Sequence, residues 1–554
     1  MTVLQASAMN PQGLLSLARV RAWCLRNGWS RGSFRALYRE AHLICIARLV
    51  HYVFLEHLCD ERIAIEGRTL YLGIDGKLEI HLSGDTPHIY LELTENPCWV
   101  ETGGRQDVPS SAAFLRALRK SLRATPYADD FPALAHDYRN SFSNLILNLA
   151  LGSRLSAPCS AIEPVYRGHG YYPFPALRIG PSIEQVVEAS HLSPAPAPLF
   201  FVNVPGYRFH SSDYADPDAC AAHWAGGALA GQGCMVPVHP WQLRLSPVIR
   251  DMLKRDLIAL SPVQLQIVPL ASQRTCRVLA SGYDIKLSLD ATLTGERRLL
   301  YRLNSHNAPF VSRVLRHVHQ LSELEEIDFQ YDVASLCWDD SLVSQHLSAI
   351  VRAPCFAGEG EEVVPVLNLW ASARQARSYL RLGDRQEALA TFDQYARVVM
   401  SGVLLLCAQW GISLEPHMQN TYIVLRDGRP VRAILRDLDN SILDPDSIRP
   451  LCQEQCIPLA PDTWAHMPAV PIGQRRLVHA LLHGHLYPVM HFLIKHMALD
   501  YRELDSCLND NWQRVSGQAH SASGRRKVQE LWALVGLTKH SLSMRLKQSA
   551  SMSF

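Results

Sequence analysis

Two polar clusters that lie close together in the sequence hold the residues best suited to chemistry. The first is Glu415-Pro-His-Met-Gln-Asn420, and the second is Arg436-Asp-Leu-Asp-Asn440. The apolar runs between them flank Asp427-Gly428, a dipeptide that strongly favours a tight β-hairpin turn. A hairpin would bring the two clusters side by side. Carboxylate, carboxamide, imidazole and guanidinium groups gathered in this way can hold phosphate and a divalent metal, so the first hypothesis is an enzyme that uses ATP.

The order of these groups is that of a kinase-type site. In such sites a catalytic loop that ends in Asn is followed by a short hairpin and then by an Asp that holds Mg²⁺. This order predicts Asp437 as a metal ligand, helped by Asn420 or Glu415, while His417 orients an acidic substrate or moves a proton. The alternative is a purely structural polar network that contains a buried Arg–Asp pair.

Three cations, Arg274, Lys286 and Arg298, are spaced twelve residues apart in the middle of the chain. Residues 274–280 and 285–290 have strand-like patterns, so one strand and one turn separate successive cations. We expect the three to lie on one sheet face, where they would repel each other unless an anion such as a triphosphate or a polycarboxylate lies among them. The alternative is three solvated cations on an exposed sheet face.

The composition restricts the class of protein. The chain has 554 residues, a formal charge of +2 and no basic stripe, which argues against a general nucleic-acid binder. Its fourteen cysteines include no CxxC pair, which indicates reduced thiols and a cytoplasmic protein. The most apolar uncharged stretch, Val398–Leu414, predicts a buried helix rather than a membrane span. No P-loop or GxGxxG motif occurs, so any phosphate must be held by side chains or by an unrelated loop such as Gly168-His-Gly170.

The periodicity along the chain predicts a mixed α+β fold. Helical spacing of apolar residues is found at 11–57, 110–124, 140–151, 340–350 and 370–410, and again after the hairpin. Alternation typical of strands is found at 62–93, with a turn at 83–85, and at 263–303. The two polar sites therefore fall in different modules, which the fold has to bring together.

Six motifs in order resemble the IucA/IucC-type NRPS-independent siderophore synthetases, a family similar to aerobactin synthetase. The motifs are Gly168-His-Gly-Tyr-Tyr-Pro173 with Arg178-Ile-Gly180, His239-Pro-Trp-Gln242, Ser272-Gln-Arg-Thr275, Lys286 with Thr294 and Arg298, Glu415-Pro-His-Met-Gln-Asn420, and Arg436-Asp437. The resemblance covers roughly residues 140–440 and is specific because the order of the motifs is kept.

The resemblance implies a fold in three parts and a reaction. Residues 1–160 would form an N-terminal thumb of helices and a small antiparallel sheet, 161–365 β-rich fingers that bind the nucleotide, and 366–554 a kinase-like palm with the hairpin and C-terminal helices. With ATP and Mg²⁺, such enzymes activate a carboxylate of citrate or a related acid as an acyl-adenylate and release pyrophosphate. An amine or alcohol then captures the acyl group. The family also implies a homodimer without nucleic-acid or membrane partners.

The resemblance also implies roles for individual residues. Nucleotide contacts come from His169, Ser272, Arg274, Thr275 and Lys286, with Gln419, Asn420 and Asp437 on the palm side. The acid substrate is contacted by Thr294, Arg298, Glu415 and His417. Glu415 and Asp437 lie at the metal, and Arg274, Arg298 and His417 are the expected catalytic residues.

The chain departs from the family pattern at three places. Tyr172 and Ala176 stand where a second His and a Lys are common, which removes a cation from that side of the site. Leu438-Asp439-Asn440 replaces a common Phe-Gln-Gly, and the Asp439 carboxylate is expected either to add a metal ligand or to bind an amine substrate.

The other readings of the sequence are a small-molecule kinase with a similar palm and a non-catalytic binder of citrate-like anions. The acid, the amine or alcohol and the final siderophore are not specified by the residues.

Overall fold

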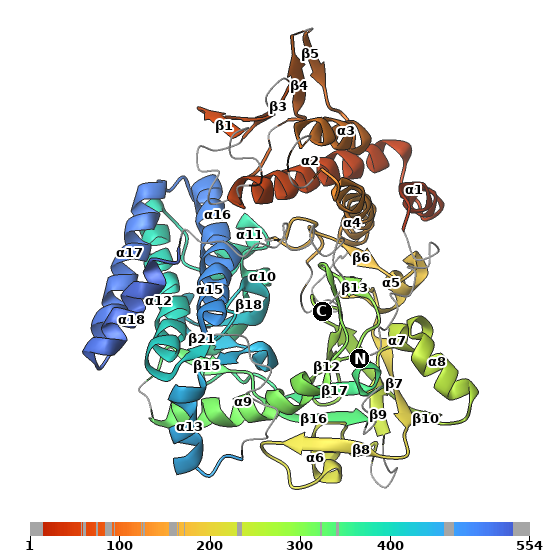
Figure 1. Cartoon of the computed structure of the whole chain (residues 1–554), viewed down its shortest axis with the longest axis vertical. Coiled ribbons are helices and arrows are strands. Elements are labelled where there is room, and N and C mark those ends of the chain that lie inside the picture. Colours follow the sequence, from red (N-terminus) through yellow and green to blue (C-terminus); the bar gives the residue numbers. More distant parts are fainter. Residues whose placement is uncertain are drawn as a thin grey trace.

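The computed structural model describes residues 15–535 except 57, 59–62, 74–75, 83–90, 94, 103, 123–124, 126–127, 155–162, 164, 171, 230–234, 322–323, 339–342 and 459–469. The fold is α+β, as the periodicity predicts. Figure 1 shows a small sheet with long helices at the top, the largest sheet at the lower right and the C-terminal helices on the left.

The N-terminal part combines helices with an antiparallel sheet in the order β1-β2-β3-β4-β5. Its elements are α1 (Leu17–Arg26), α2 (Arg31–Leu55), β1 (Ile63–Glu66), β2 (Thr69–Leu72), β3 (Lys77–His81), β4 (Cys98–Glu101), β5 (Gly104–Asp107), α3 (Ser111–Ser121) and α4 (Phe131–Gly152). The side chain of Ser110 caps α3 by accepting a hydrogen bond from Ala113 N at 3.2 Å. The turn predicted at 83–85 lies outside the described residues.

An antiparallel sheet in the order β8-β16-β17-β12-β11-β10-β7-β9 forms the middle of the molecule. Its strands are β7 (Ala197–Asn203), β8 (Tyr207–Ser211), β9 (Met235–Val238), β10 (Ala259–Pro269), β11 (Thr275–Val278), β12 (Asp284–Leu287), β16 (Asp332–Trp338) and β17 (Ser348–Arg352). The helix α5 (Ile183–Ala189) precedes β7, α6 (Pro217–Trp224) lies between β8 and β9, and α7 (Pro240–Leu245) and α8 (Pro247–Lys254) lie between β9 and β10. The sheet positions β11 and β12, from which two of the predicted cations come.

The three predicted cations do not share one sheet face, which corrects the sequence expectation. Thr275 lies opposite Lys286 in the large sheet, and Arg274 immediately precedes β11. Arg298 instead follows β14 (Glu296–Arg297), which belongs to a separate small sheet with β13 (Thr292–Leu293) and β6 (Arg178–Ile179). The chain leaves the large sheet after Leu287, so the twelve-residue period does not continue as one ladder.

The helix predicted at 340–350 is wrong over the residues that the structure describes. Ser344–His346 forms one 3₁₀ turn, and Ser348–Arg352 forms the strand β17. All five residues of β17 are buried because the strand lies between β16 and β12. A strand buried on both faces shows no alternation, so its apolar run resembles that of a buried helix.

The predicted hairpin is confirmed as β20 (Thr421–Arg426) and β21 (Arg429–Leu435). Both turn residues, Asp427 with φ 52° and Gly428 with φ 72°, have the left-handed conformation that a type I′ turn requires. β15 (Ile327–Phe329) and β18 (Glu361–Pro365) complete a sheet in the order β15-β21-β20-β18.

Helices pack around this second sheet. They include α9 (Arg302–Leu321), α10 (Val366–Leu369), α11 (Ala373–Tyr379), α12 (Arg385–Trp410) and α13 (Pro445–Glu454), and the short strands β19 (Ile412–Ser413) and β22 (Ile442–Leu443) pair beside them. The predicted buried helix Val398–Leu414 is confirmed through residue 410 as the C-terminal half of α12.

The C-terminal helices are α15 (Val470–Leu481), a π-helical turn (Leu482–Leu486), α16 (Tyr487–Met497), α17 (Tyr501–Gln518) and α18 (Ala522–Trp532). The continuous segment Val470–Met497 is long and apolar enough to cross a membrane, but 67% of its most apolar window is buried inside the protein. Burial of this kind is typical of the core helix of a soluble protein.

Candidate active site

One cleft of about 350 Å³ collects the residues that the sequence predicts for the site, with the exception of Asp439. The residues that line it include His169, Ser272, Arg274, Thr275, Lys286, Thr294, Arg298, Glu415, His417, Gln419, Asn420 and Asp437. The first seven come from the segments before and within the large sheet and the small sheet beside it, and the last five flank the hairpin. The fold therefore brings together residues that are up to 268 positions apart, from 169 to 437.

A tight turn between β10 and β11 presents Ser272, Gln273 and Arg274 to the cleft. Leu270 N donates to Thr275 O at 2.8 Å and Thr275 N donates to the Ser272 hydroxyl at 3.1 Å, which closes the turn. Gln273 has φ 66°, a left-handed conformation that is uncommon for a residue with a side chain. The turn therefore has a fixed shape before any ligand arrives.

Arg274 and Arg298 meet at the next part of this wall. The Arg274 guanidinium donates to the Arg298 carbonyl at 3.3 Å. Arg298 in turn donates to the Leu293 carbonyl at 3.0 Å and to the Thr294 hydroxyl. Burial and the neighbouring Arg298 lower the pKa of Arg274 to about 10, so Arg274 stays charged at neutral pH. Two neighbouring guanidinium groups favour an anion between them, and they are not the solvated surface cations of the alternative reading.

The opposite wall is the loop from Glu415 to Asn420, which ends in a 3₁₀ turn (Met418–Asn420). Asn420 N donates to the His417 carbonyl at 2.8 Å, and the Asn420 side chain donates to the Glu415 carbonyl at 3.4 Å. The Glu415 carboxylate lies 4.0 Å from the Arg476 guanidinium of α15. These bonds fold the loop on itself and leave acidic, imidazole and carboxamide groups along the cleft.

Arg436 is a structural residue rather than the partner of Asp437. Its guanidinium donates to the Gln419 carbonyl at 2.6 and 2.9 Å and to the Tyr422 hydroxyl at 2.7 Å, and it forms an ion pair with Glu163 at 2.7 Å. Because Arg436 N also donates to Asn420 O at 3.0 Å, the two polar clusters do lie side by side, as the hairpin predicts. The partner of Arg436 is thus Glu163, while the buried Arg–Asp pair of the alternative reading is formed by Arg352 and Asp437.

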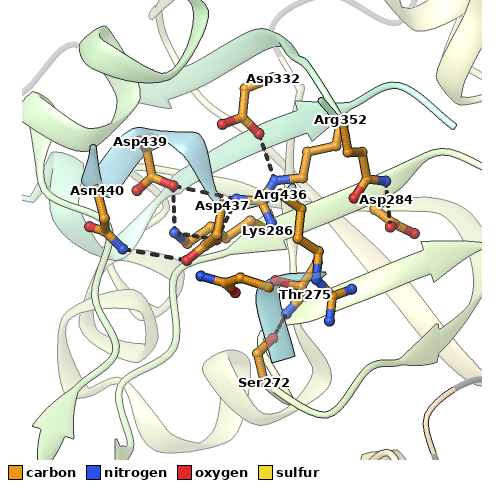
Figure 2. A network of polar contacts seen from close by, with 12 residues as sticks. Ser272, Thr275, Asp284, Lys286, Asp332, Arg352, Arg436, Asp437, Asp439 and Asn440 are labelled. Carbon is orange, nitrogen blue, oxygen red and sulfur yellow. Dashed lines mark hydrogen bonds and ion pairs between the residues drawn. The ribbon is translucent and has the colours of Figure 1, made fainter. Parts of the chain in front are cut away.

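Asp437 instead pairs with two cations of the large sheet, Lys286 and Arg352 (Figure 2). Lys286 Nζ lies 2.9 Å from Asp437 and 2.6 Å from Asp439, and its side chain is only 1% exposed. Although burial raises it, Lys286 and Arg352 hold the pKa of Asp437 well below its usual range. Asp437 is therefore ionised, and its side chain is 20% exposed toward the cleft that it lines.

Asp439 does not face the cleft, which corrects both expectations for it. Its side chain has no exposed surface and contacts Lys286 at 2.6 Å and Arg352 at 3.4 Å. Its second oxygen accepts a hydrogen bond from Asn304 of α9 at 3.2 Å. In this arrangement the carboxylate reaches neither an amine substrate nor a metal in the cleft.

Three residues of the cleft share a feature of the backbone. Gln273, Thr294 and Asp437 have φ of 66°, 49° and 70°, and they are three of the seven left-handed residues other than glycine in the described chain. Such conformations persist only where the surroundings enforce them, and they gather at functional sites. The left-handed backbone conformations therefore indicate the same cleft as the functional site that the polar side chains indicate.

Tyr172 and Ala176, the two residues that depart from the family pattern in the first motif, both line the cleft. At Gly295, φ is 86° and an added Cβ would lie 1.9 Å from the Tyr172 hydroxyl, so this glycine permits the close approach. A cation absent at Ala176 is present two residues later as Arg178, whose guanidinium is held by the carboxamide oxygens of Asn144 and Asn148, each at 3.1 Å.

Sequence reasoning assigned no role to several residues of this cleft, among them Arg178, Arg352, Arg476 and His479. Arg352 ends the strand β17, most of which periodicity predicts as a helix. The sequence therefore did not indicate that Arg352 pairs with Asp437. Arg476 and His479 lie on α15, about forty residues beyond the hairpin. Arg178 belongs to the Arg178-Ile-Gly180 motif. Its position as a cation in an otherwise apolar segment could have indicated a role in the site.

The donors in the cleft fit Mg²⁺ held together with a nucleotide. Asp437, Glu415 and the carboxamides of Gln419, Asn420 and Asn440 supply hard oxygen atoms. Among the described residues no group of three His, Cys, Asp or Glu side chains is placed to hold a metal ion. A metal here would therefore need phosphate oxygens as well, which is how Mg²⁺ is usually bound with ATP.

Comparisons with known proteins match two regions of the chain to families. Residues 160–371 match the IucA/IucC family, and residues 392–553 match a family described as ferric iron reductase FhuF-like transporter. Staphyloferrin A synthase of Staphylococcus aureus is 23% identical over 224 residues, which are 38% of this chain and 38% of that protein.

Two solved structures share the fold over nearly the whole chain. The petrobactin biosynthesis protein AsbB of Bacillus anthracis has a TM-score of 0.74 at 16% identity and covers 97% of this chain and 96% of its own. The ATP-bound aerobactin synthetase IucA of Klebsiella pneumoniae has a TM-score of 0.72 at 17% identity, over 91% of this chain and 97% of its own. By the matched region 160–371, the order of its motifs and this fold, the chain is similar to the IucA/IucC family of NRPS-independent siderophore synthetases.

Proposed function

We propose that the protein is an ATP-dependent ligase that adenylates a carboxylate of citrate or a related polycarboxylic acid and joins it to an amine or an alcohol. One observation carries the proposal. A wall that holds the neighbouring cations Arg274 and Arg298 faces a wall that holds His417, Glu415 and the ionised Asp437 across one cleft. The first wall suits two anions that must be brought together, and the second suits the metal that accompanies one of them.

The reaction has two steps. A carboxylate oxygen of the acid attacks the α-phosphorus of ATP, and the bond to the oxygen that bridges to the β-phosphate breaks, which releases pyrophosphate. The nitrogen or oxygen of the second substrate then attacks the acyl carbon, and AMP leaves. Mg²⁺, when bound with ATP, offsets the charge of the phosphates.

The chain's own residues supply orientation and charge in these steps. Arg274, with Ser272 and Thr275, holds the phosphates, and His169 adds a contact from the preceding loop. Arg298 and Thr294, already joined by a hydrogen bond, hold a carboxylate of the acid. His417 and Glu415 are the groups on the facing wall that can accept the proton that the amine loses.

The names of similar proteins support this reading. The solved relative IucA is described as ATP-bound, and relatives include a D-ornithine–citrate ligase of Staphylococcus aureus and a spermidine–citrate ligase of Bacillus anthracis, each matched over 37% of this chain. The proposal includes the thumb, fingers and palm division at residues 160 and 365, a homodimer and a cytoplasmic location.

A pyrophosphate-release screen tests the proposal. Citrate, 2-oxoglutarate and citryl amides are offered with MgATP against a panel of polyamines and amino acids. Acid-dependent release of pyrophosphate and AMP is the expected result. Release of ADP instead would identify a kinase. A protein that binds the acid equally well after Asp437→Asn and never turns over ATP would be a non-catalytic binder.

A further inference from the structure

The two carboxylates that follow the hairpin share the same two cations. Oδ1 of Asp437 and Oδ1 of Asp439 both contact Lys286 Nζ, at 2.9 and 2.6 Å, and both contact Arg352 Nη2 (Figure 2). The four groups thus form a ring of alternating charge. Asp332 adds a third carboxylate on the far side of Arg352, at 2.6 Å from its Nε.

The two shared carboxylates differ in what else they can reach. The side chain of Asp437 is 20% exposed at the cleft, whereas that of Asp439 has no exposed surface. The remaining oxygen of Asp439 is occupied by Asn304 at 3.2 Å, and that of Asp437 accepts only a long bond of 3.4 Å from Asn440, which itself lines the cleft. Only Asp437 can therefore turn toward a ligand.

A single carboxylate could not serve both the cations and a metal. Lys286 and Arg352 are each 1% exposed, so solvent cannot replace a lost partner. If Asp437 were the only carboxylate on the cleft side, its use by a metal would leave two buried cations with Asp332 alone, and uncompensated buried charge is strongly unfavourable.

We propose that Asp439 is a positioning residue that serves as the permanent counter-ion of Lys286 and Arg352, and so frees Asp437 to bind the divalent metal of the nucleotide complex. The inference rests on the proposed function, because it assumes that a metal and ATP enter this cleft. It assigns a role to the one position after the hairpin where this chain carries an extra acid in place of the common Gln.

The test compares Asp439→Asn with wild type in two binding measurements. The first is binding of Mn²⁺, followed by electron paramagnetic resonance, to protein saturated with α,β-methylene-ATP. The second is binding of the same analogue without metal, in the presence of EDTA, followed by calorimetry. Asp439→Asn weakens Mn²⁺ binding about ten- to hundredfold, the usual range for a residue that supports a metal ligand.

The same variant leaves the metal-free affinity for the analogue unchanged or makes it tighter, because one negative charge beside Lys286 is gone. Asp439→Glu, which keeps the charge, restores Mn²⁺ binding to within a few-fold of wild type. Asp437→Asn, which removes the ligand itself, abolishes it. A purely structural role for Asp439 predicts instead that both affinities fall together, and this result overturns the inference.

Equal Mn²⁺ affinity in Asp439→Asn and wild type also overturns it. If Asp439→Asn does not fold, Asn304→Leu replaces it. This change keeps both charges of the pair, removes the bond to the outer oxygen of Asp439 together with a long bond of 3.4 Å to Asn440, and is expected to shift Mn²⁺ binding in the same direction by a smaller factor. A wild-type protein that binds neither the analogue nor Mn²⁺ would contradict the proposed function, whereas a wild type that binds both with an unaffected Asp439→Asn contradicts only the role of Asp439.

Discussion

At the scale of single residues, the cleft contains two kinds of cation. Some are placed to bind a ligand, and others are already paired with carboxylates of the protein. Arg274 and Arg298 donate to carbonyl and hydroxyl groups, and Arg298 also pairs with the largely exposed Glu296 carboxylate at 3.2 Å. Lys286, in contrast, is neutralised by two carboxylates before any ligand arrives. Charge alone in the sequence did not distinguish these two situations.

Loss of either wall should stop the reaction. Arg274→Ala removes the charge at the phosphates, and His417→Ala removes the imidazole that faces the acid. Each is expected to lower acid-dependent pyrophosphate release by about a hundredfold or more, the usual effect of removing one electrostatic contact to a transition state. The measurement is a coupled pyrophosphate assay at saturating ATP.

Arg255→Ala is the matched control, because the exposed pair of Arg255 with Asp251 lies on α8 outside the cleft. It should leave the rate unchanged. Full activity in both Arg274→Ala and His417→Ala would show that the site has been placed wrongly.

Prediction from sequence succeeded for residues whose signal is local. The Ser272–Thr275 turn and the 415–420 cluster combine polar types that are improbable in a core, and both line the cleft. It failed for Arg352, because the partners of that residue come from β16 and from the loop after the hairpin, about 20 and 85 positions away. Contacts over such separations leave no pattern in a single sequence.

At the scale of elements, the same contrast separates the hairpin from β17. The hairpin is specified by its own turn, since Asp427 and Gly428 both tolerate a positive φ. The strand β17 is specified by its neighbours β16 and β12, which bury both of its faces. An element whose identity depends on burial is therefore harder to predict than one whose identity depends on a turn.

The π-helical turn between α15 and α16 supports the 415–420 loop from behind. It carries the buried His485, whose Nδ1 donates to the Pro416 carbonyl at 2.8 Å and whose Nε2 accepts from the Tyr395 hydroxyl at 2.6 Å. π-Helical turns are rare and occur mostly at functional sites. Here the extra residue in the turn accompanies an imidazole that links α12 to the cleft loop.

Replacement of this imidazole should destabilise the protein and loosen the site together. His485→Leu leaves the Pro416 carbonyl and the Tyr395 hydroxyl without partners, at a cost of about 1–3 kcal/mol each. The expected results are a lower free energy of unfolding and a higher KM for the acid. Urea denaturation and steady-state kinetics are the measurements.

Tyr395→Phe is the control for this change, since it removes only the bond on the α12 side. It should cost roughly half as much stability and leave the KM close to that of wild type. A His485→Leu protein as stable as wild type would refute the supporting role of the π-helical turn.

At the scale of the whole molecule, long-range polar contacts connect modules that have separate cores. Lys495 of α16 pairs with Glu92 of the N-terminal part at 2.7 Å, and Arg436 pairs with Glu163 at 2.7 Å. The charge ring of Lys286, Arg352, Asp437 and Asp439 joins the large sheet to the loop after the hairpin. The cleft thus lies where the modules meet, and its shape depends on ionisation in several parts of the chain.

Mild acid should therefore weaken the whole fold. Burial lowers the pKa of His191 and His485 to about 4 and that of His239 to about 3, with Arg178 adding to the effect at His191. These imidazoles are neutral in the folded protein, whereas in the unfolded chain they titrate near pH 6.5. Between these values the unfolded chain binds more protons, so the stability present above pH 6.5 is lost as the pH falls toward 4.

Between pH 7 and pH 5.5 each of the three imidazoles removes about 1 kcal/mol of stability. Asp332 acts in the opposite direction, because burial raises its pKa to about 6 and the folded protein takes up that proton first. The net loss is roughly 2–3 kcal/mol, measured as the difference between urea unfolding free energies at the two pH values. His485→Leu should reduce this pH-dependent loss by about a third, since one of the three groups is gone. If stability stays level or rises between pH 7 and 5.5, these imidazoles are charged in the folded protein. The assignment of a neutral imidazole between α12 and the cleft loop would then be wrong.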